Sequence, residues 1–342
     1  MAFCTKDFAL PSSFLAVPAA ETVSMSEITA IVPVHGRCEL TAQLLEDLRA
    51  QSVPVQEIII VDNASPDQTA KLAVAAGARL ISMGENAGFA CAVNRGINAA
   101  ETEYVLIVNN DVRLPEDWLE KLLYVSKLGA WFAAGKLLSG TRPSEIDGTF
   151  DLISRGGCAW RGQHGEPDQE HNKAAMQMDF PSFTAGLFRR SLFTRVGPLE
   201  EKFGSYLEDV EFGLRCVEAG LWGMYVPDAV GIHLGSATRG TWHPETTRQI
   251  ARNQLWIVAR HFPRVSWAVL VSQVLFVALA FSNGAGWAAL CGKIEGLTGF
   301  WKMRRKEPHV RPDFLLRHER EIARLQGQPA RDLFWRFYFK LT

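Results

Sequence analysis

Two sets of side chains in this sequence could carry chemistry. Asp111 follows the apolar run at residues 104–108, with Asn109 and Asn110 between them, and Glu208 stands next to Asp209 much later in the chain. A carboxylate at the end of a buried strand is a hard oxygen ligand that suits a divalent cation. A second carboxylate can take a proton from a hydroxyl group. These positions therefore suggest a cation site and a general base.

Each of these positions also has an ordinary structural explanation. Asp111 is the kind of residue that caps the turn before a helix, and the helix is expected to begin near Pro115. Acidic residues such as Glu208 and Asp209 are common at helix starts. Glu211 and Arg215 have the spacing of an i,i+4 ion pair, which needs no function. The elements around these residues must therefore decide between the two interpretations.

The first half of the chain alternates between apolar runs and amphipathic segments. We expect strands at 28–34, 57–61, 79–82 and 104–108, and helices at 40–51, 69–76 and 89–100. This alternation predicts an α/β fold with a mostly parallel, doubly wound sheet. Polar residues, including Asp62 and Asn86, follow three of the four strands. Such strand ends share one edge of the sheet, where ligands bind.

The second half has a different pattern. Residues 139–180 are rich in glycine and polar residues, which predicts irregular loops and a short hairpin over the sheet. Val210, Leu214 and Val217 predict a helix that ends near Gly220, so Glu208 and Asp209 lie at its start. A strand at 222–226 is expected next, followed closely by Ile232 and His233.

Composition excludes several classes of protein. The chain has 342 residues, is 47% hydrophobic and carries a net charge of -1, which gives no case for a nucleic-acid partner. Its six cysteines are scattered without a CxxC pair, so neither a zinc site nor a disulfide framework is indicated, and a reducing cytosol is expected. Gly284–Ala289 matches a dinucleotide fingerprint by letters but lacks the βαβ context, and no P-loop pattern is present.

Both ends of the chain differ from its middle. We expect a disordered leader at 1–26, with Met1 or Met25 as the start, a main domain at 27–260, and an apolar and basic extension at 261–342. Residues 265–281 are apolar but shorter than the ~20 residues of a typical spanning helix. An interfacial or partly buried hairpin, a membrane span and a core helix remain open. The basic residues after Trp301 favour the hairpin at a membrane surface.

Taken together, these motifs resemble the family 2 glycosyltransferases, most closely the bacterial rhamnosyltransferase-like members. The resemblance extends over roughly residues 28–260 and implies the GT-A nucleotide-diphospho-sugar transferase fold. The matching segments occur in the family's order and are Ile31–Val34, Val61–Ser65, Glu85–Phe89, Val108–Val112, Thr184–Gly186, Leu207–Phe212 with Arg215, and His233.

The resemblance also implies roles for single residues. Asp62 would contact the nucleotide base and Asn86 the donor. Asp111, the last acid of a DXD-like motif, and His233 would bind Mg²⁺ or Mn²⁺ at the diphosphate, and Asp209 would be the catalytic base with Glu208 beside it. The nucleotide-sugar pocket would further include Pro33, Val34, Asn94, Asn109 and Asn110.

The implied reaction is inverting glycosyl transfer in cell-surface polysaccharide synthesis. The donor would be a nucleotide-diphosphate sugar, with dTDP-rhamnose favoured over a UDP- or GDP-sugar. The acceptor would be a saccharide or a lipid-linked saccharide, and the protein would be cytoplasmic and peripheral to the inner face of the cell membrane. The sequence departs from the family pattern at Asn109, where the motif's first Asp would stand, so the cation site carries less charge.

Two other functions stay open from the sequence. A non-catalytic protein that binds nucleotide sugars or carbohydrate is one alternative, and Asn109 favours it. A nucleotidyltransferase is the other, although residues 32–39 lack the Gly-rich, Arg- and Lys-bearing loop that it would need after the first strand.

Overall fold

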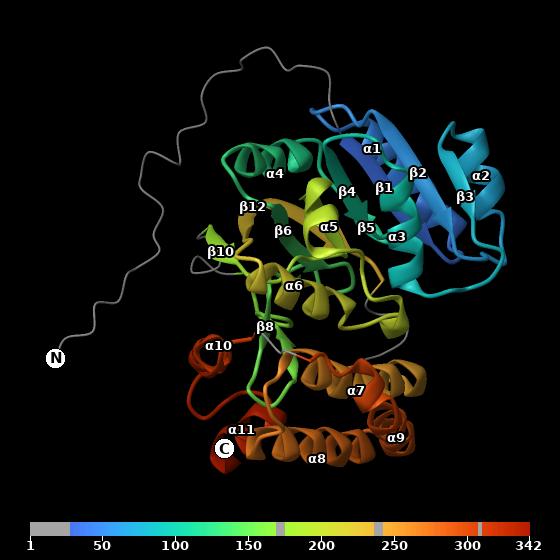
Figure 1. Ribbon diagram of the computed structural model, residues 1–342. Coiled ribbons are helices and arrows are strands. Elements are labelled where there is room, and N and C mark those ends of the chain that lie inside the picture. The colour runs from blue at the N-terminus through green and yellow to red at the C-terminus, as the bar shows by residue number, and fades with distance from the viewer. Residues whose placement is uncertain (1–27, 169–174, 236–241, 307–309) are drawn as a thin grey trace.

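The computed structural model describes residues 28–168, 175–235, 242–306 and 310–342. The predicted leader at 1–26 lies outside these ranges. Within them, helices cover both faces of a central sheet, and a further layer of C-terminal helices packs beyond one of these helical layers (Figure 1).

The first half of the sheet is parallel, as the sequence predicts. Strands β1 (Ile28–Val34), β2 (Glu57–Asp62), β3 (Arg79–Ser82) and β4 (Tyr104–Val108) lie in the order β4-β1-β2-β3. Helices α1 (Cys38–Arg49), α2 (Thr69–Ala75) and α3 (Phe89–Ala99) connect them. Because all four strands run the same way, the loops after them meet at one edge of the sheet.

The second half of the sheet is mixed, which corrects the expectation of a mostly parallel sheet. β11 (Ala185–Arg189) lies antiparallel between β4 and β6 (Phe132–Ser139). β12 (Gly223–His233) is parallel to β6, and β10 (Met176–Met178) is antiparallel at the edge. The short strands β5 (Val112–Arg113) and β7 (Ile146–Gly148) pair with β12 and β6. A buried strand such as β11 is apolar on both faces, so its residue pattern carries no sign of its direction.

The segment after residue 221 forms one long strand where the sequence suggests two pieces. The ladder between β12 and β6 is interrupted between Val226 and Val230. Pro227 lies in this interval and has no N–H to donate, which accounts for a local irregularity. The hairpin predicted within 139–180 is present as β8 (Asp151–Ile153) and β9 (Ala159–Arg161).

Alternate residues of the strands form two cores. Ile28, Ala30 and Val32 pack toward α1 and α4 (Trp118–Lys127). Ile31 belongs to the opposite core, with α3, α5 (Ser191–Val196) and α6 (Glu208–Glu218). The period of two along β1 thus anchors a helical layer on each face.

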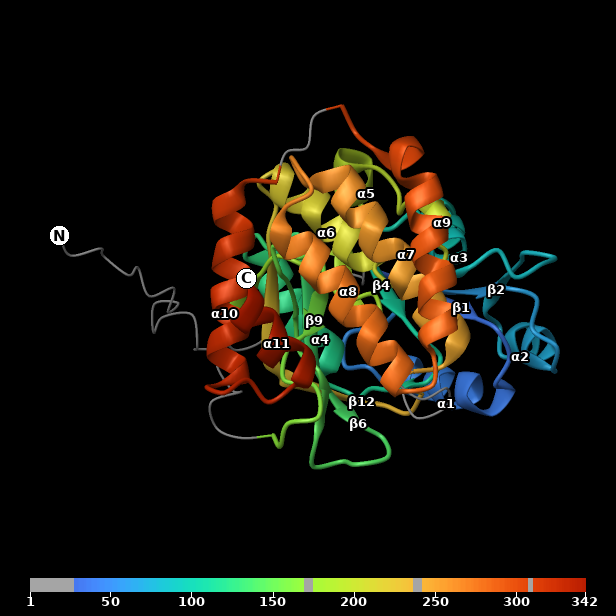
Figure 2. The same cartoon turned by 90° about the horizontal axis from the view of Figure 1, so that it is seen from below.

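The C-terminal residues form a helical layer that is continuous with one core. Its helices are α7 (Pro244–His261), α8 (Trp267–Ser282), α9 (Gly286–Met303), α10 (Pro312–Gln326) and α11 (Leu333–Leu341), seen from below in Figure 2. Trp335 and Tyr338 belong to the same buried cluster as residues of β4. Among the described residues no helix has the length and apolarity to cross a membrane.

Candidate active site

The loops after β1, β2 and β3 are tied together at the sheet edge. Asp62 ends β2, is buried, and its Oδ1 accepts a hydrogen bond from the Ser65 amide at 2.9 Å. The side chain of Asn63 donates to Asn86 Oδ1 at 3.0 Å and accepts from the Ala87 amide at 2.9 Å. Asp62 and Asn86 are therefore held at the same edge through Asn63.

Asn110 fixes the loop after β1. Its side-chain nitrogen donates to the Gly36 carbonyl at 3.0 Å and to Thr41 Oγ1 at 2.9 Å. Gly36 and Arg37 both have positive φ, 84° and 65°, so this loop needs such support. The turn places Arg37 Nη1 3.3 Å from Asp111 Oδ2.

Asp111 and His233 are brought together by strand pairing. His233 pairs with Val112, the first residue of β5, directly after Asp111. His233 Nε2 lies 3.4 Å from Asp111 Oδ1. Gly235 packs so closely here that a Cβ would fall 1.5 Å from Asp111 Oδ2. The backbone of this segment thus encloses the carboxylate.

A second carboxylate orients the imidazole from behind. Asp147, at the centre of β7, is almost fully buried, and its Oδ2 lies 2.8 Å from His233 Nδ1. Burial alone would lower the pKa of His233, but the hydrogen bonds and charges of Asp111 and Asp147 raise it to about 9. A carboxylate on the far ring nitrogen is the usual support of a metal-binding histidine.

This pair fits a divalent cation. Asp111 Oδ1 is buried, and among the described residues its nearest donor is His233 Nε2 at 3.4 Å, which is long for a hydrogen bond and leaves room for a cation or another donor. The described residues contain no cluster of three or more His, Cys, Asp or Glu that could hold a metal ion without other ligands. Asp111 and His233 would therefore share the cation with oxygens from elsewhere.

The acids at the start of α6 follow a strained turn. Tyr206 and Leu207 have φ values of 70° and 66°, which side chains larger than glycine rarely adopt. Asn253 of α7 is fully buried and donates to the carbonyls of Phe203, Ser205 and Tyr206 at 2.7–3.1 Å. The turn that presents Glu208 and Asp209 is thus enforced by a helix of the C-terminal layer.

Glu208 and Asp209 differ in their surroundings. Burial and the charge of Asp209 raise the pKa of Glu208 well above its ordinary value, and Glu208 Oε2 is buried with no hydrogen-bond partner among the described residues. Burial also raises the pKa of Asp209, but Arg161 and the Val210 amide, 2.7 Å from Asp209 Oδ1, work against it. Asp209 is therefore the better proton acceptor of the two.

Arg161 of β9 connects the two parts of the site. Its Nη1 lies 3.6 Å from Asp147 Oδ2, and its Nε lies 3.9 Å from Asp151 Oδ1. Burial and Asp209 raise the pKa of Asp151 to about 7, although Arg161 opposes them. A narrow cavity lined by Asp151, Arg161, Ser182 and Thr184 opens beside these groups. Charged side chains thus run from Asp111 and His233, through Asp147 and Arg161, to Asp151 and the acids of α6.

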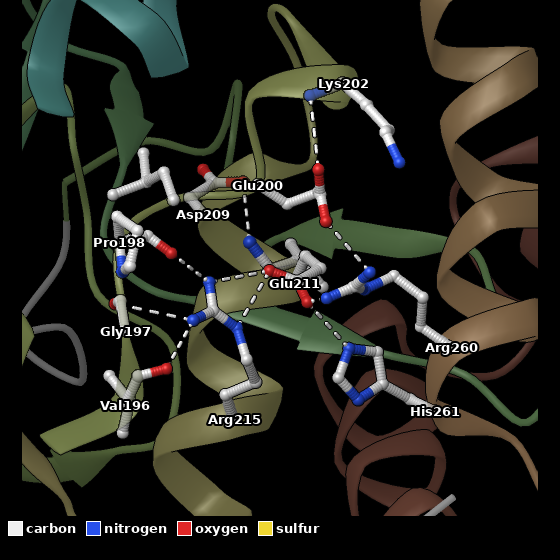
Figure 3. A network of polar contacts seen from close by, with 12 residues as sticks. Val196, Gly197, Pro198, Glu200, Lys202, Asp209, Glu211, Arg215, Arg260 and His261 are labelled. Carbon is white, nitrogen blue, oxygen red and sulfur yellow. Dashed lines mark hydrogen bonds and ion pairs between the residues drawn. The ribbon is translucent and has the colours of Figure 1, made fainter. Parts of the chain in front are cut away.

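A buried ion network fixes α6 against α7 (Figure 3). Glu211 Oε1 accepts from Arg260 Nε at 2.9 Å and lies 3.2 Å from His261 Nε2, while Glu211 Oε2 accepts from Arg215 Nη2 at 2.9 Å. The i,i+4 pair expected from the sequence is thus confirmed as part of a larger network. This network holds the helix whose first turn carries Asp209.

The predicted site residues divide into two groups. Asp62, Asn86, Asp111 and His233 lie around the sheet edge and its neighbouring strand, and Asp209 is linked to them through Arg161. Asn94 instead holds the 199–201 segment, with its amide bonded to Leu199 and Glu201. Pro33 and Val34 are the last two residues of β1 and are buried. The backbone amide of Asn109 donates to the Thr184 carbonyl at 2.9 Å. Their contacts with a nucleotide stay predictions.

Sequence reasoning missed the residues that join the two acids. Asp147, Asp151 and Arg161 lie in the Gly-rich stretch that shows no periodicity, and Asn253 lies in the middle of a helix. Four charged residues within the fifteen positions from 147 to 161, in a segment rich in glycine, were the available signal. Without the strand pairing, nothing in that pattern places them beside residues 111 and 209.

Comparison with known proteins indicates the family that this chain resembles. Residues 29–196 match the family model described as glycosyl transferase family 2. The N-acetylglucosaminyl-diphospho-decaprenol L-rhamnosyltransferase of Mycobacterium tuberculosis is 29% identical over 211 residues, which cover 52% of this chain and 66% of that protein. The O-antigen biosynthesis protein RfbC of Myxococcus xanthus is 28% identical, over 62% of this chain and 18% of that one. The chain thus spans less than two thirds of these relatives.

Two solved structures show the same fold. The mannosyltransferase PcManGT of Pyrobaculum calidifontis, in complex with GDP-Man and Mn²⁺, has a TM-score of 0.51 at 17% sequence identity. The superposition covers 96% of this chain and 90% of the mannosyltransferase chain. GalNAc-T7 with UDP, GalNAc and Mn²⁺ has a TM-score of 0.58 at 11% identity, over 82% of this chain and 57% of its own. The predicted GT-A fold, with a helical C-terminal region, is confirmed.

Proposed function

We propose that this chain, whose residues 29–196 match the model of glycosyl transferase family 2, transfers a sugar from a nucleotide-diphosphate donor to a hydroxyl group with inversion at the anomeric carbon. The observation that carries the proposal is the series of close charged contacts from Asp111 and His233, through Asp147, to Arg161, whose charge also acts on the carboxyl group of Asp209. This arrangement supports a donor side at Asp111 and His233 and a base side at Asp209.

The base side accounts for activation of the acceptor. Asp209 accepts the hydroxyl proton as the acceptor oxygen attacks the anomeric carbon, and the bond from that carbon to the diphosphate oxygen breaks. A positioned carboxylate of this kind contributes roughly 10²–10⁴-fold. Glu208 keeps its proton because its pKa is raised well above the ordinary range by burial and by Asp209. A single displacement of this kind needs no covalent intermediate on the protein.

The donor side is formed by residues from the strand ends. Asp111 and His233 would hold Mg²⁺ or Mn²⁺, which when bound stabilises the negative charge of the departing diphosphate. Asp62 and Asn86 would contact the nucleotide, with Pro33, Val34, Asn94, Asn109 and Asn110 assigned to the same pocket. The Mn²⁺ in both solved neighbours supports a cation at this position.

For the substrates, we propose a rhamnosyl donor and a lipid-linked saccharide acceptor. The Mycobacterium tuberculosis relative is named for L-rhamnosyl transfer to a diphospho-decaprenol-linked sugar. This favours dTDP-rhamnose over the UDP- or GDP-sugars of the solved neighbours and suits polysaccharide synthesis. A lipid-linked acceptor further implies a cytoplasmic protein that associates peripherally with the inner face of the membrane.

The experiment is a transfer assay with purified protein and Mn²⁺. dTDP-rhamnose, UDP- and GDP-sugars are offered with a lipid-linked N-acetylglucosamine acceptor, and product is measured by mass spectrometry. Asp209→Asn should lose at least about a hundredfold in rate, while Asp313→Asn, a change of a highly exposed acid on α10, should not. Full activity of Asp209→Asn would refute the base assignment. Donor binding without any transfer would favour the non-catalytic alternative. Transfer of a nucleotide to a sugar phosphate would favour a nucleotidyltransferase.

A further inference from the structure

Helices α8 and α9 expose large apolar side chains along one stripe each. Leu270, Val274 and Phe281 of α8 recur at helical spacing and are each about half exposed or more. On α9, Trp287 is 76% exposed and Trp301 is 80% exposed, with Ile294 and Leu297 between them. Trp267, at the start of α8, is 66% exposed. Clusters of this kind mark an interaction surface.

α9 has the reverse of the usual arrangement of a surface helix. Its inward face is rich in glycines: a Cβ on Gly292 would fall 2.1 Å from the Arg248 carbonyl oxygen of α7, and Gly296 and Gly299 are also tightly packed. Its outward face carries tryptophan, isoleucine and leucine. Because small residues inside let the helix sit close to α7, the large side chains are left pointing away from the protein.

α11 extends this surface. Leu333, Phe337 and Leu341 recur every four residues and are each about half exposed. The indole nitrogen of Trp267 donates to the Leu341 carbonyl at 3.0 Å, which joins the end of α11 to the start of α8. Figure 2 shows α8, α9 and α11 together on the near side of the molecule. We call the exposed side chains of these three helices the apolar face.

A groove of about 560 Å³ opens between α8 and α9 within this face. Its walls are apolar, with Val265, Val274, Leu297 and Trp301 among them. The ammonium of Lys293 lies beneath it and is bound by the Ala251 carbonyl at 2.9 Å, by Gln254 Oε1 at 2.7 Å and by Gln273. Lys293 is the charged residue among those that line the groove, and its ammonium is bound by these oxygen atoms on the protein side. The groove therefore presents hydrocarbon at its opening.

The charges around the apolar face have one predominant sign. From Arg264 to Lys306 the only acid is Glu295, and it is paired with Arg248. Arg264 and Lys302 border α8 and α9, and Arg336 and Lys340 project from α11; all four are exposed. A symmetric contact with a second copy would bring these basic groups against one another. An anionic surface complements them.

We propose that the apolar face docks on a bilayer with anionic lipids, with the tryptophans at the boundary between headgroups and acyl chains and a lipid chain in the groove. Exposed tryptophan, aliphatic side chains and a basic rim are what an interfacial helical surface requires. Docking of this face is independent of the transfer reaction, because its residues lie outside the site described above.

The test is binding of the full chain to vesicles of phosphatidylcholine alone and of phosphatidylcholine with 30% phosphatidylglycerol. Sedimentation should show binding to the anionic vesicles, and brominated acyl chains should quench the tryptophan fluorescence of the bound protein. The double change Trp287→Ser and Trp301→Ser should weaken binding about tenfold or more. Val74→Ser, at an exposed apolar residue of α2, should leave it unchanged. The double change Lys302→Glu and Lys340→Glu should remove the preference for anionic lipid.

The opposite outcomes would overturn the proposal. Wild-type protein that fails to sediment with either vesicle, or that binds without quenching, would exclude immersion of the apolar face. A stable dimer in solution that the tryptophan changes dissociate would assign the face to a second copy. Thermal melting of each variant shows whether a loss of binding reflects docking or unfolding, and donor hydrolysis in the absence of lipid serves as an independent readout of the active site.

Discussion

Among the single side chains, Arg161 is the one that contacts carboxylates in both parts of the proposed site. Its guanidinium lies close to Asp147 and Asp151, and its charge opposes the rise in the pKa of Asp209 that burial causes. Burial pushes these carboxyl groups toward their neutral forms. Arg161 thus favours the ionised form of Asp209, which is the form that accepts a proton.

Replacing Arg161 should therefore change the pH profile of the reaction. In Arg161→Gln the pKa of Asp209 rises further, so more of the base is protonated at a given pH. The acidic limb of kcat/KM should move to higher pH, and on that limb the rate at a fixed pH should fall about tenfold for each unit by which the pKa rises. Arg161→Lys keeps a positive charge and should shift less. An unchanged acidic limb in Arg161→Gln would show that Arg161 does not act on the base.

Asp111 should determine cation binding. With a nucleoside diphosphate and Mn²⁺ present, the wild-type protein should melt at a higher temperature than with either alone, because a ligand at 100 times its Kd adds about 2.7 kcal/mol. Asp111→Asn should remove the part of this gain that Mn²⁺ contributes, and chelation with EDTA should do the same for the wild type. Gly235→Ala should act similarly, since its Cβ would displace the carboxylate. A full Mn²⁺ gain in Asp111→Asn would place the cation elsewhere.

Among the elements, α6 depends most on a buried charge. Burial alone would raise the pKa of Glu211, but the hydrogen bond with His261 and the charges of Arg215, His261 and Arg260 hold it well below its ordinary value. A carboxyl group with a lowered pKa stabilises the fold above its ordinary pKa of about 4.3, and this contribution is lost as the pH falls below that value.

Glu211→Gln should consequently destabilise the protein in a pH-dependent way. Breaking a buried ion pair on one side costs about 3–5 kcal/mol, because the partners stay buried and unpaired. Urea unfolding should show this difference at pH 7 and a smaller one below pH 4, where the unfolded wild-type chain gains a proton at this residue. Glu321→Gln, whose partner Arg324 is exposed, is the control and should cost less than about 1 kcal/mol. A constant difference across this pH range would contradict the mechanism.

The elements also show why prediction from the sequence succeeds in one half and stops in the other. β1, β3 and β4 have the bounds expected from the sequence, because their apolar runs are short and closed by polar or small residues. The direction of β11 was not predictable, since a strand buried on both faces has no period. Asp111 and Asp209 were found from neighbouring motifs, whereas Arg161 acquires its position from the β8–β9 hairpin and from pairings distant in sequence.

In the whole molecule, the C-terminal layer is part of the folded unit. Trp335 and Tyr338 pack in the cluster that contains Val105 and Ile107 of β4, and Asn253 holds the turn before Asp209. The predicted domain boundary between residues 260 and 261 falls at the end of α7. The residues on its two sides share the buried cluster that contains β4, Trp335 and Tyr338.

A chain that ends at residue 263 should fail to fold cooperatively. It would expose the partners of α8, α10 and α11 in that core, and loss of a single large aromatic side chain already costs about 3–5 kcal/mol. Circular dichroism melting should show no sharp transition, while Lys340→Ala, a change of an exposed residue on α11, should melt like the wild type. A truncated protein with the wild-type melting temperature would show that 27–260 is an autonomous domain.

The pairing of His233 with Val112 has a consequence for the order of events during synthesis. The two proposed cation ligands, Asp111 and His233, are 122 positions apart in the sequence, and the ribosome releases the N-terminal one first. His233 is the last residue of β12, the final strand among the described residues. A nascent chain that has released residues 28–200 carries Asp111 but lacks its partner, and a slip of one residue in β12 would turn the imidazole to the opposite face. Affinity for Mn²⁺ should thus arise only after the last strand has joined the sheet, which makes cation uptake a marker of completed assembly.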